Sequence, residues 1–390
     1  MKMVKHVVCV DFFSGAGGMT NGLISAGVHV LAGVDNEPGC EKTYVQNNKN
    51  KNGSRPEFIC KNIFPKSTIH PTGQQAEIRQ RIEQLIRRYK RENNVKAVSL
   101  VFAICAPCQP FTKITKIEMT DGRQFKRAND ANLLLTTLDL IKHFKPAAII
   151  CENVEGMVTR EDAVILQFKA RLKRLGYSFD VKVINAIDFG VPQNRKRTIG
   201  IGLRTVIAGC KADVPTKDPR VIAPKTVEEA IGYLPAIAAG EVHPKIKNHR
   251  TRALNDLNLK RISSVRPGES NLVLKHTKYG DLSLDCHRNL EERAGKPSFT
   301  DTYTRMRANA PSPTITTKCL SITNGRFGHY DTTQNRGLSA KEAALLQTFP
   351  RTFVFYPVEN IQFTALLIGN AVPPKLAKFF GNYVVQKLPD

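Results

Sequence analysis

Residues 7–35 read VVCVDFFSGAGGMTNGLISAGVHVLAGVD, and their pattern is the clearest indication of the fold class. An apolar run at 7–12 leads into the glycine-dense turn SGAGG, after which apolar residues recur at helical spacing over 19–24. A second apolar run, at 28–34, ends at Asp35. Strand, turn, helix and strand in this order predict a βαβ unit of the kind that builds a parallel, doubly wound α/β sheet.

Three more apolar runs, at 97–104, 147–151 and 198–203, extend the predicted sheet. Each borders polar or reactive residues, and ligand sites in such sheets lie beyond the carboxyl ends of the strands. Between 76 and 91, apolar residues at helical spacing alternate with arginine and lysine, which predicts an amphipathic helix. Its basic face fits either a solvated surface or a DNA contact.

The second half of the chain differs in composition. From about residue 205, proline, glycine, asparagine and basic residues are interspersed, which predicts a separate loop-rich domain. Regular patterning returns at 338–348, a predicted helix with Ser339 as its N-cap and Glu342 three residues later. A final helix follows GNAVPP at 369–374. The expected fold class is α/β, with a second, smaller domain.

The composition indicates an intracellular protein, and its basic charge fits either a polyanionic partner or lysine used for solubility. The 58 Lys and Arg residues exceed the 34 Asp and Glu residues and give a formal net charge of +24, so nucleic acid is the first partner to consider. No apolar run is long enough to span a membrane, and no signal peptide is expected. The nine scattered cysteines predict free thiols in a reducing, cytoplasmic compartment.

The glycine turn indicates a cofactor site, although an ordinary tight connection has the same character. A dinucleotide fingerprint would need a third glycine where Thr20 stands. Glycine lets the backbone approach a ligand closely, and Asp35 at the end of the next strand suits a ribose diol. A nucleoside-containing cofactor without a pyrophosphate fits this arrangement, and S-adenosylmethionine is the candidate.

The run at 97–104 leads into CAPCQPFT at 105–112, where Cys105 and Cys108 have C-x-x-C spacing. A structural zinc site would need a second ligand pair. A redox pair would begin a helix, which the neighbouring prolines disfavour. A single nucleophile, Cys108, is therefore favoured, because proline on each side stiffens the turn and basic surroundings would stabilise a thiolate.

A second reactive candidate lies in AAIICENVEG at 147–156. A carboxylate at the end of an apolar strand is costly unless it is paired or functional. Glu152 is therefore expected either to hold and donate a proton in catalysis or to form a structural pair with arginine. The segment QNRKR at 193–197 supplies Arg195 and Arg197, so both interpretations place Glu152 near an arginine.

Taken in order, these motifs resemble those of the cytosine-C5 DNA methyltransferases. The match runs through DFFSGAGG, VDNE (34–37), APCQPFT, ENVEG, QNRKR, RMRANAPSPTITT (305–317) and GNAVPP, and covers nearly the whole chain outside 66–97 and about 210–302. The resemblance implies a Rossmann-like S-adenosylmethionine-dependent methyltransferase fold. Residues 1–204, completed by 335–390, would form the catalytic and cofactor-binding domain, and 205–334 the target-recognition domain and return segment.

The resemblance also implies a role for each motif. Attack of Cys108 on C6 of a flipped cytosine would activate C5, and Glu152 would bond ring N3 and the exocyclic amine. Arg195 and Arg197 would orient the base and the carboxylate. The cofactor would be S-adenosylmethionine, and no metal is expected. The implied cofactor-binding residues are Phe13, Gly15, Gly17, Gly18, Asp35, Asn36, Asn62, Ile63, Pro107 and Asn370, with Asn62 in place of the family's common aspartate.

Double-stranded DNA is the expected partner, bound by a monomer, and a cognate restriction endonuclease is a candidate second partner. A mobile loop at 113–131, with Gly122 as its hinge, would close over DNA phosphates. The expected DNA-contacting residues are Gln109, Lys113, Arg123, Lys126, Arg127, Lys278 and Arg288. The alternatives are a tRNA-directed member of the family, whose Cys-Phe-Thr tripeptide is missing, and a non-catalytic homologue, which would normally lack Cys108 or Glu152.

Overall fold

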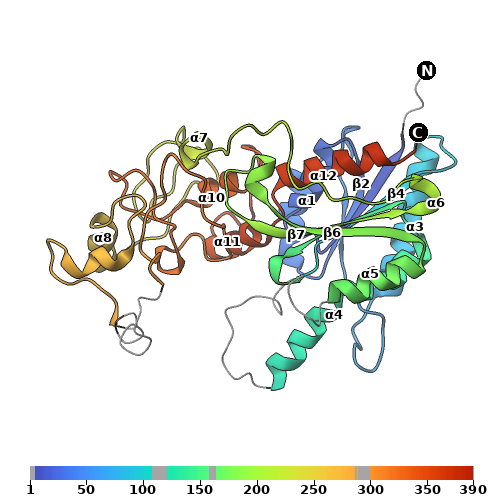
Figure 1. Cartoon of the computed structure of the whole chain (residues 1–390), viewed down its shortest axis with the longest axis horizontal. Coiled ribbons are helices and arrows are strands. Elements are labelled where there is room, and N and C mark those ends of the chain that lie inside the picture. The colour runs from blue at the N-terminus through green and yellow to red at the C-terminus, as the bar shows by residue number, and fades with distance from the viewer. Residues whose placement is uncertain (1–4, 108–120, 158–163, 286–287, 289–298, 390) are drawn as a thin grey trace. The chain divides into compact units, whose positions relative to one another are not determined.

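The computed structural model describes residues 5–107, 121–157, 164–285, 288 and 299–389, except the side chains of 121–132. A seven-stranded sheet, in the order β3-β2-β1-β4-β5-β7-β6, forms the centre of the first part of the chain (Figure 1). The strands are β1 (Val7–Phe12), β2 (His29–Asp35), β3 (Glu57–Cys60), β4 (Ser99–Ile104), β5 (Ala148–Val154), β6 (Tyr177–Asn185) and β7 (Lys196–Arg204).

The sheet is parallel except at one strand. Strands β3, β2, β1, β4 and β5 run parallel, whereas β7 runs antiparallel to both β5 and β6. The prediction of a parallel sheet is therefore wrong for β7. A parallel pair needs a crossover connection, usually a helix, between its strands. The connection from β6 to β7 holds only a short 3-10 turn (Ala186–Phe189), so the chain reverses direction instead.

Helices pack on the sheet, and the second half of the described chain holds shorter helices separated by long loops. They are α1 (Gly18–Ser25), α2 (Glu41–Asn47), α3 (Gln75–Glu92), α4 (Asp121–Phe144), α5 (Val164–Arg174), α6 (Thr205–Ala208), α7 (Val227–Ile231), α8 (Asp256–Ser263), α10 (Ala340–Leu346), α11 (Ile361–Asn370) and α12 (Pro374–Lys387). Helices α3, α4 and α5 share one apolar core with the strands. Helices α1 and α12 lie side by side (Figure 1). Gly22 permits their close approach, because a Cβ there would lie 2.4 Å from that of Ala377.

The predicted helix at 338–348 is α10, and its cap is as expected. Ser339 and Glu342 exchange hydrogen bonds between side chain and backbone, which forms a capping box. The loop predicted at 113–131 is wrong from Asp121 onward, because 121–144 form α4 and Gly122 lies within the helix. Buried residues such as Leu134, Leu138 and Ile141 anchor this helix in the core, and propagation along a formed helix is favourable. Residues 113–120 lie outside the described residues.

The chain divides into two compact units. The first comprises Met1–Phe189, Lys196–Arg220 and Val372–Asp390, and the second Gly190–Arg195 and Val221–Ala371. The boundary expected at 335 therefore shifts: α10 and α11 pack together and α10 packs on α7, so 335–371 belong to the second unit. The assignment of catalysis and recognition to separate domains stays a prediction. Among the described residues, no helix is long and apolar enough to cross a membrane.

Candidate cofactor and catalytic site

The glycine turn between β1 and α1 leaves open space beside Gly15. Gly15 has φ +49° and Gly17 has φ +87°, both in the left-handed region that favours glycine. A Cβ on Gly17 would lie 2.3 Å from Nδ2 of Asn48, so packing requires this glycine. A Cβ on Gly15 would meet no described atom within 4 Å. A ligand can therefore approach the backbone of the turn at Gly15, while Gly18 begins α1.

Asp35 faces the same turn from the end of β2. Its Oδ2 accepts a 2.8 Å hydrogen bond from the N–H of Gly15, and its Oδ1 accepts a 3.0 Å bond from the N–H of Glu37. Burial raises the pKa of Asp35, and the backbone hydrogen bonds oppose that rise. A carboxylate held in this way at the turn suits the two hydroxyls of a ribose. The residues present fit a nucleoside-containing cofactor.

Asp11, to which the motif alone assigns no role, lies fully buried beneath the turn. Its Oδ2 accepts bonds from the N–H of Thr20, at 3.1 Å, and from the Thr20 hydroxyl, at 2.7 Å. That hydroxyl lies 3.0 Å from the hydroxyl of Tyr44 on α2. Oδ1 of Asp11 is buried without a hydrogen-bond partner among the described atoms. Burial raises the pKa of Asp11 to about 7. The network connects β1, α1 and α2 under the glycine turn.

Four further predicted cofactor residues lie on separate segments. Half-buried Phe13 takes φ +60° as the chain leaves β1, and its N–H donates to the carbonyl of Val34 at 2.8 Å. Asn36, after β2, and Pro107, after β4, are exposed. Asn370 ends α11 in the second unit and is also exposed. Contacts between these residues and a cofactor stay predictions.

Asn62, which stands where the family commonly has aspartate, holds the loop after β3. Its Oδ1 accepts a 3.1 Å bond from the N–H of Phe64, and its Nδ2 donates to the Thr72 hydroxyl at 3.2 Å. The neighbouring Ile63 is buried in the core. An amide oxygen has two lone pairs, so Asn62 keeps one for a ligand. Its contact with the adenine amino group stays a prediction.

Strand β4 leads into the C-x-x-C segment. The N–H of Cys105 donates to the carbonyl of Phe12 at 3.2 Å, and burial raises the pKa of the Cys105 thiol. Cys105 is therefore a poor source of thiolate. Cys108, Gln109 and Lys113 lie outside the described residues. In the part of the chain that the structure describes, no cluster of His, Cys, Asp and Glu could hold a metal ion.

Glu152 lies within β5, one register step from the end of β4. Ile104 pairs with Cys151 and Glu152 with Ile199, so the carboxyl ends of β4 and β5 are adjacent. Nε of Arg197 lies 3.0 Å from Oε1 of Glu152, whose side chain is 9% exposed. The contact is an ion pair without an aligned hydrogen bond at Oε1. The structure places an arginine beside Glu152, as the sequence led us to expect.

Arg195 takes a different course from Arg197. It belongs to the second unit and is almost completely buried. Its guanidinium donates to the carbonyls of Ile315, at 2.8 Å, and Gly369, at 3.0 Å. These bonds join QNRKR to the PTIT and GNAVPP segments inside one unit. The described contacts of Arg195 are structural, and its predicted contact with a base stays a prediction.

The predicted DNA-contacting residues lie on separate elements. Arg123, Lys126 and Arg127 belong to α4, but their side chains lie outside the described part. Lys278 is exposed in the second unit. Arg288 donates to the carboxylates of Asp281, at 2.6 Å, and Asp285. Its guanidinium is therefore already occupied in this structure.

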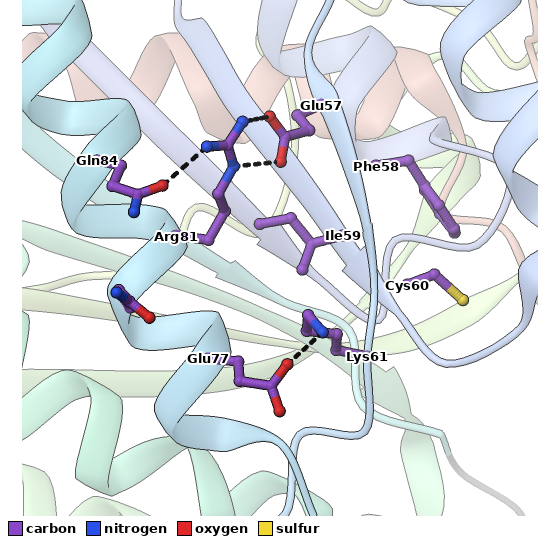
Figure 2. A pocket seen from close by; sticks show the side chains of 9 residues that line it. Glu57, Phe58, Ile59, Cys60, Lys61, Glu77, Arg81 and Gln84 are labelled. Carbon is purple, nitrogen blue, oxygen red and sulfur yellow. Dashed lines mark hydrogen bonds and ion pairs between the residues drawn. The ribbon is translucent and has the colours of Figure 1, made fainter.

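A groove of about 370 Å³ lies between β3 and α3 (Figure 2). Arg81 donates through Nε to Oε1 of Glu57 at 2.6 Å and forms a second bond to the same carboxylate, and Lys61 pairs with Glu77. These pairs connect the helix to the edge strand (Figure 2). The apolar face of α3 packs in the core, which confirms the expected amphipathic helix. A DNA contact by its basic face stays untested.

Comparison with known proteins gives a consistent result over the whole length. The family model of C-5 cytosine-specific DNA methylases matches residues 7–386. Type II methylase M.HgiDII of Herpetosiphon aurantiacus is 34% identical over 387 residues, which cover 97% of this chain and 95% of that protein. Type II methyltransferase M1.HphI of Haemophilus parahaemolyticus is 30% identical over 378 residues, which cover 97% of this chain and 86% of that protein.

Solved structures share the fold at lower identity. A DNA modification methyltransferase encoded within an E. coli prophage has a TM-score of 0.61 at 20% identity, with 97% of this chain and 99% of that chain covered. The Entamoeba histolytica methyltransferase EhMeth has a TM-score of 0.60 at 14% identity, with 99% and 100% covered. At these identities the likeness establishes the fold alone.

Proposed function

The chain belongs to the family of C-5 cytosine-specific DNA methylases and is a DNA (cytosine-5-)-methyltransferase, and we propose that Cys108, Glu152 and Arg197 carry the reaction. The observation that supports this most is the adjacency of two strand ends. Strand β4 leads toward Cys108, and β5 beside it holds Glu152 with Arg197 at 3.0 Å. A nucleophile and a proton-holding carboxylate would thus approach one base from neighbouring strands.

The chemistry follows from the needs of cytosine. The Cys108 thiolate adds to C6, which makes C5 electron-rich. Glu152 bonds N3 and the exocyclic amine and supplies a proton to N3 as charge enters the ring. Arg197 orients the carboxylate. After methylation the C5 proton passes to water, the Cys108–C6 bond breaks to release the thiolate, and the N3 proton returns to Glu152, which restores the aromatic ring.

S-adenosylmethionine, when bound, would supply the methyl group as a sulfonium. We propose that the open space beside Gly15 and the carboxylate of Asp35 hold its nucleoside portion, because the turn admits a ligand there and Asp35 suits the ribose. Phe13, Asn62 and the other residues that the resemblance implies would complete the pocket. The base must leave the duplex to react, at a cost of a few kcal/mol of stacking and pairing.

A covalent trap tests the proposal. In DNA with 5-fluorocytosine at the target, fluorine replaces the C5 proton and cannot be removed by a base. The enzyme should therefore remain covalently attached to this DNA when S-adenosylmethionine is present. Cys108→Ser should abolish this adduct on a denaturing gel, while Cys210→Ser should form it normally. Absence of the adduct in the wild-type protein would overturn the covalent route. A tRNA substrate in parallel should give no methyl transfer.

The named relatives are type II methylases, which supports a further proposal about partners. We propose that the chain acts as a monomer on duplex DNA in the cytoplasm, at the nucleoid in a bacterial host, and that a cognate restriction endonuclease reads the same site. Sequencing 5-methylcytosine in an expressing host would give the methylated motif. An endonuclease that cuts this motif only when it is unmethylated would support the pairing. A methyltransferase that is active only as a dimer would contradict the proposed monomeric state.

A further inference from the structure

A rigid exposed turn lies in the second unit at 277–280. The N–H of Thr277 donates to the carbonyl of Gly280 at 3.3 Å, and the N–H of Gly280 donates back at 3.0 Å. The Thr277 hydroxyl donates to the same Gly280 carbonyl at 2.6 Å and accepts a bond from the N–H of Tyr279 at 3.1 Å. Gly280 takes φ +86°, which closes the turn. The side chains of Lys278 and Tyr279 are thereby presented to solvent on a fixed backbone.

Two ammonium groups meet at the ring of Tyr279. Nζ of Lys278 lies 5.0 Å from the ring centroid, and Nζ of Lys260, from the last turn of α8, lies 5.6 Å from it. Both lysines are exposed, and Tyr279 is 44% exposed. A cation over an aromatic face is attracted by the ring's quadrupole. The ring thus attracts two ammonium groups at the surface.

The support beneath this cluster is well defined. Leu274 and Leu282, on either side of the turn, are buried in a small core with Ile262 of α8. Nearby acids are already engaged: Asp281 accepts bonds from Ser283 and Arg288, and Asp285 pairs with Arg288. Arg288 therefore offsets part of the negative charge beside the turn, and the two exposed ammonium groups of Lys260 and Lys278 carry the positive charge of the cluster.

We propose that Lys260, Lys278 and Tyr279 form a contact surface for the sugar-phosphate backbone of duplex DNA, which positions the DNA without reading its bases. The inference rests on the proposed function only in that the bound polymer is DNA. Lysine ammonium groups are compact point charges suited to phosphates, and phosphate contacts fix register while base-edge contacts carry specificity. The Tyr279 hydroxyl at the exposed end of the ring can donate to a further phosphate oxygen.

The charge of the polymer favours this partner. The chain carries a formal net charge of +24, so it attracts polyanions as a whole. A specific binding site differs from this general attraction because it holds several charged groups and hydrogen-bond donors in fixed positions. Here the turn, the core and the aromatic ring hold two ammonium groups and one hydroxyl in place, which lowers the ordering cost of binding.

The test measures binding of the full-length protein to a fluorescent duplex that contains its methylated motif, between about 50 and 200 mM salt. The logarithm of the binding constant falls linearly with the logarithm of the salt concentration, and each lost phosphate contact should reduce the magnitude of this slope by about 0.9. The double variant Lys260→Ala, Lys278→Ala should therefore reduce it by about 1.8. Tyr279→Ala should weaken binding about 2- to 5-fold, the range of one exposed cation–aromatic interaction. Tyr279→Phe should keep most of the affinity because the ring remains.

Lys387→Ala is the matched control, because Lys387 also stacks on a tyrosine, Tyr383 at 5.4 Å, but lies on α12 of the first unit. It should leave the slope unchanged. Thermal unfolding of each variant checks the fold. An unchanged slope in the double variant overturns the proposal, and so does a changed methylation motif, which would show base reading. A wild-type protein that neither binds nor methylates duplex DNA would instead overturn the proposed function.

Discussion

Nε of Arg197 lies 3.0 Å from Oε1 of Glu152. The two residues lie on the antiparallel strands β7 and β5, where Arg197 is directly opposite Val154. Both side chains are largely buried, yet Oε1 has no aligned hydrogen bond among the described atoms. A buried acceptor without such a bond is costly. A substrate amine or protonated ring nitrogen would satisfy it. The pair is thus stabilised by charge while its capacity for hydrogen bonding stays open.

Glu152→Gln should lower turnover by about 10²- to 10⁴-fold, because an amide has no proton to supply at N3. Cofactor affinity should change little, since glutamine has nearly the same shape, whereas the melting temperature should fall because the largely buried Arg197 loses its charge partner. Single-turnover methylation gives the turnover, cofactor titration gives the affinity, and thermal unfolding gives the melting temperature. Glu155→Gln is the matched control, because Glu155 lies three residues further on, is 46% exposed and meets Lys196 only at 3.9 Å. Normal turnover of Glu152→Gln with a clearly lower melting temperature would instead identify the carboxylate as structural.

Two glycine variants separate packing from ligand binding at the turn. Gly17→Ala should destabilise the first unit strongly, because its Cβ would lie 2.3 Å from Asn48 and 2.9 Å from the Tyr44 ring. Gly15→Ala should cost only about 1–2 kcal/mol for its left-handed backbone, but it should weaken S-adenosylmethionine binding more than tenfold by filling the open space. Calorimetric titration and thermal unfolding report the two effects. Wild-type affinity in Gly15→Ala would show that the cofactor binds elsewhere.

The buried Asp11 predicts a pH dependence of stability. Burial raises its pKa from 3.8 to about 7, so between these values the folded state holds a proton that the unfolded state has lost. The free energy of unfolding should therefore fall as pH rises from about 4 to 7, by about 1.4 kcal/mol per pH unit from this group, and level off above. Asp11→Asn should remove this component. Urea unfolding of both proteins across the range measures it, and parallel curves would contradict the prediction.

Sequence patterns predicted the strands that are mostly apolar and buried. Strands β1, β2, β4 and β5 are continuous buried runs, and they appear within a few residues of their expected bounds. Strand β6 was not predicted, because only part of its length is buried and its alternation is irregular. The βαβ pattern also could not reveal the reversed direction of β7, which depends on the short connection before it.

At the site, the contacts that the sequence could not predict are those between segments far apart in the chain. Arg195 and Arg197 alternate in sequence, but the chain passes from the second unit to the first between residues 195 and 196. Their side chains consequently belong to different units, which alternation along one strand cannot predict. Tyr44 joins Asp11 through Thr20 across three elements. Lys260 reaches the ring of Tyr279, in the turn at 277–280, from helix α8. No local motif encodes either contact.

Glu342 should be the most sensitive position in the second unit. Arg336 donates to both of its carboxylate oxygens, at 2.8 and 2.7 Å, and both side chains are at most 1% exposed. Glu342→Gln leaves a buried guanidinium without its charge partner, which typically costs 3–5 kcal/mol. Glu92→Gln, in the exposed pair with Arg88, should cost less than about 1 kcal/mol. Hydrogen exchange at 336–346 measures the first loss locally, and unchanged protection there would refute it.

The last prediction concerns Arg288, for which sequence and structure suggest different roles. The sequence led us to expect a DNA contact, whereas the structure shows its guanidinium bound to Asp281 and Asp285. Hydrogen bonds from Ser283, together with the charge of Arg288, lower the pKa of Asp281, so this carboxylate is ionised at neutral pH. Arg288→Ala would expose two negative charges beside the Lys278 turn and should weaken DNA binding more at low salt than at high salt. Adding Asp281→Asn and Asp285→Asn should restore the affinity if Arg288 acts by neutralising them. Binding assays and methylation sequencing of the single and triple variants decide between the roles. If Arg288→Ala broadens the methylated motif, and the motif stays broad in the triple variant, Arg288 reads a base directly.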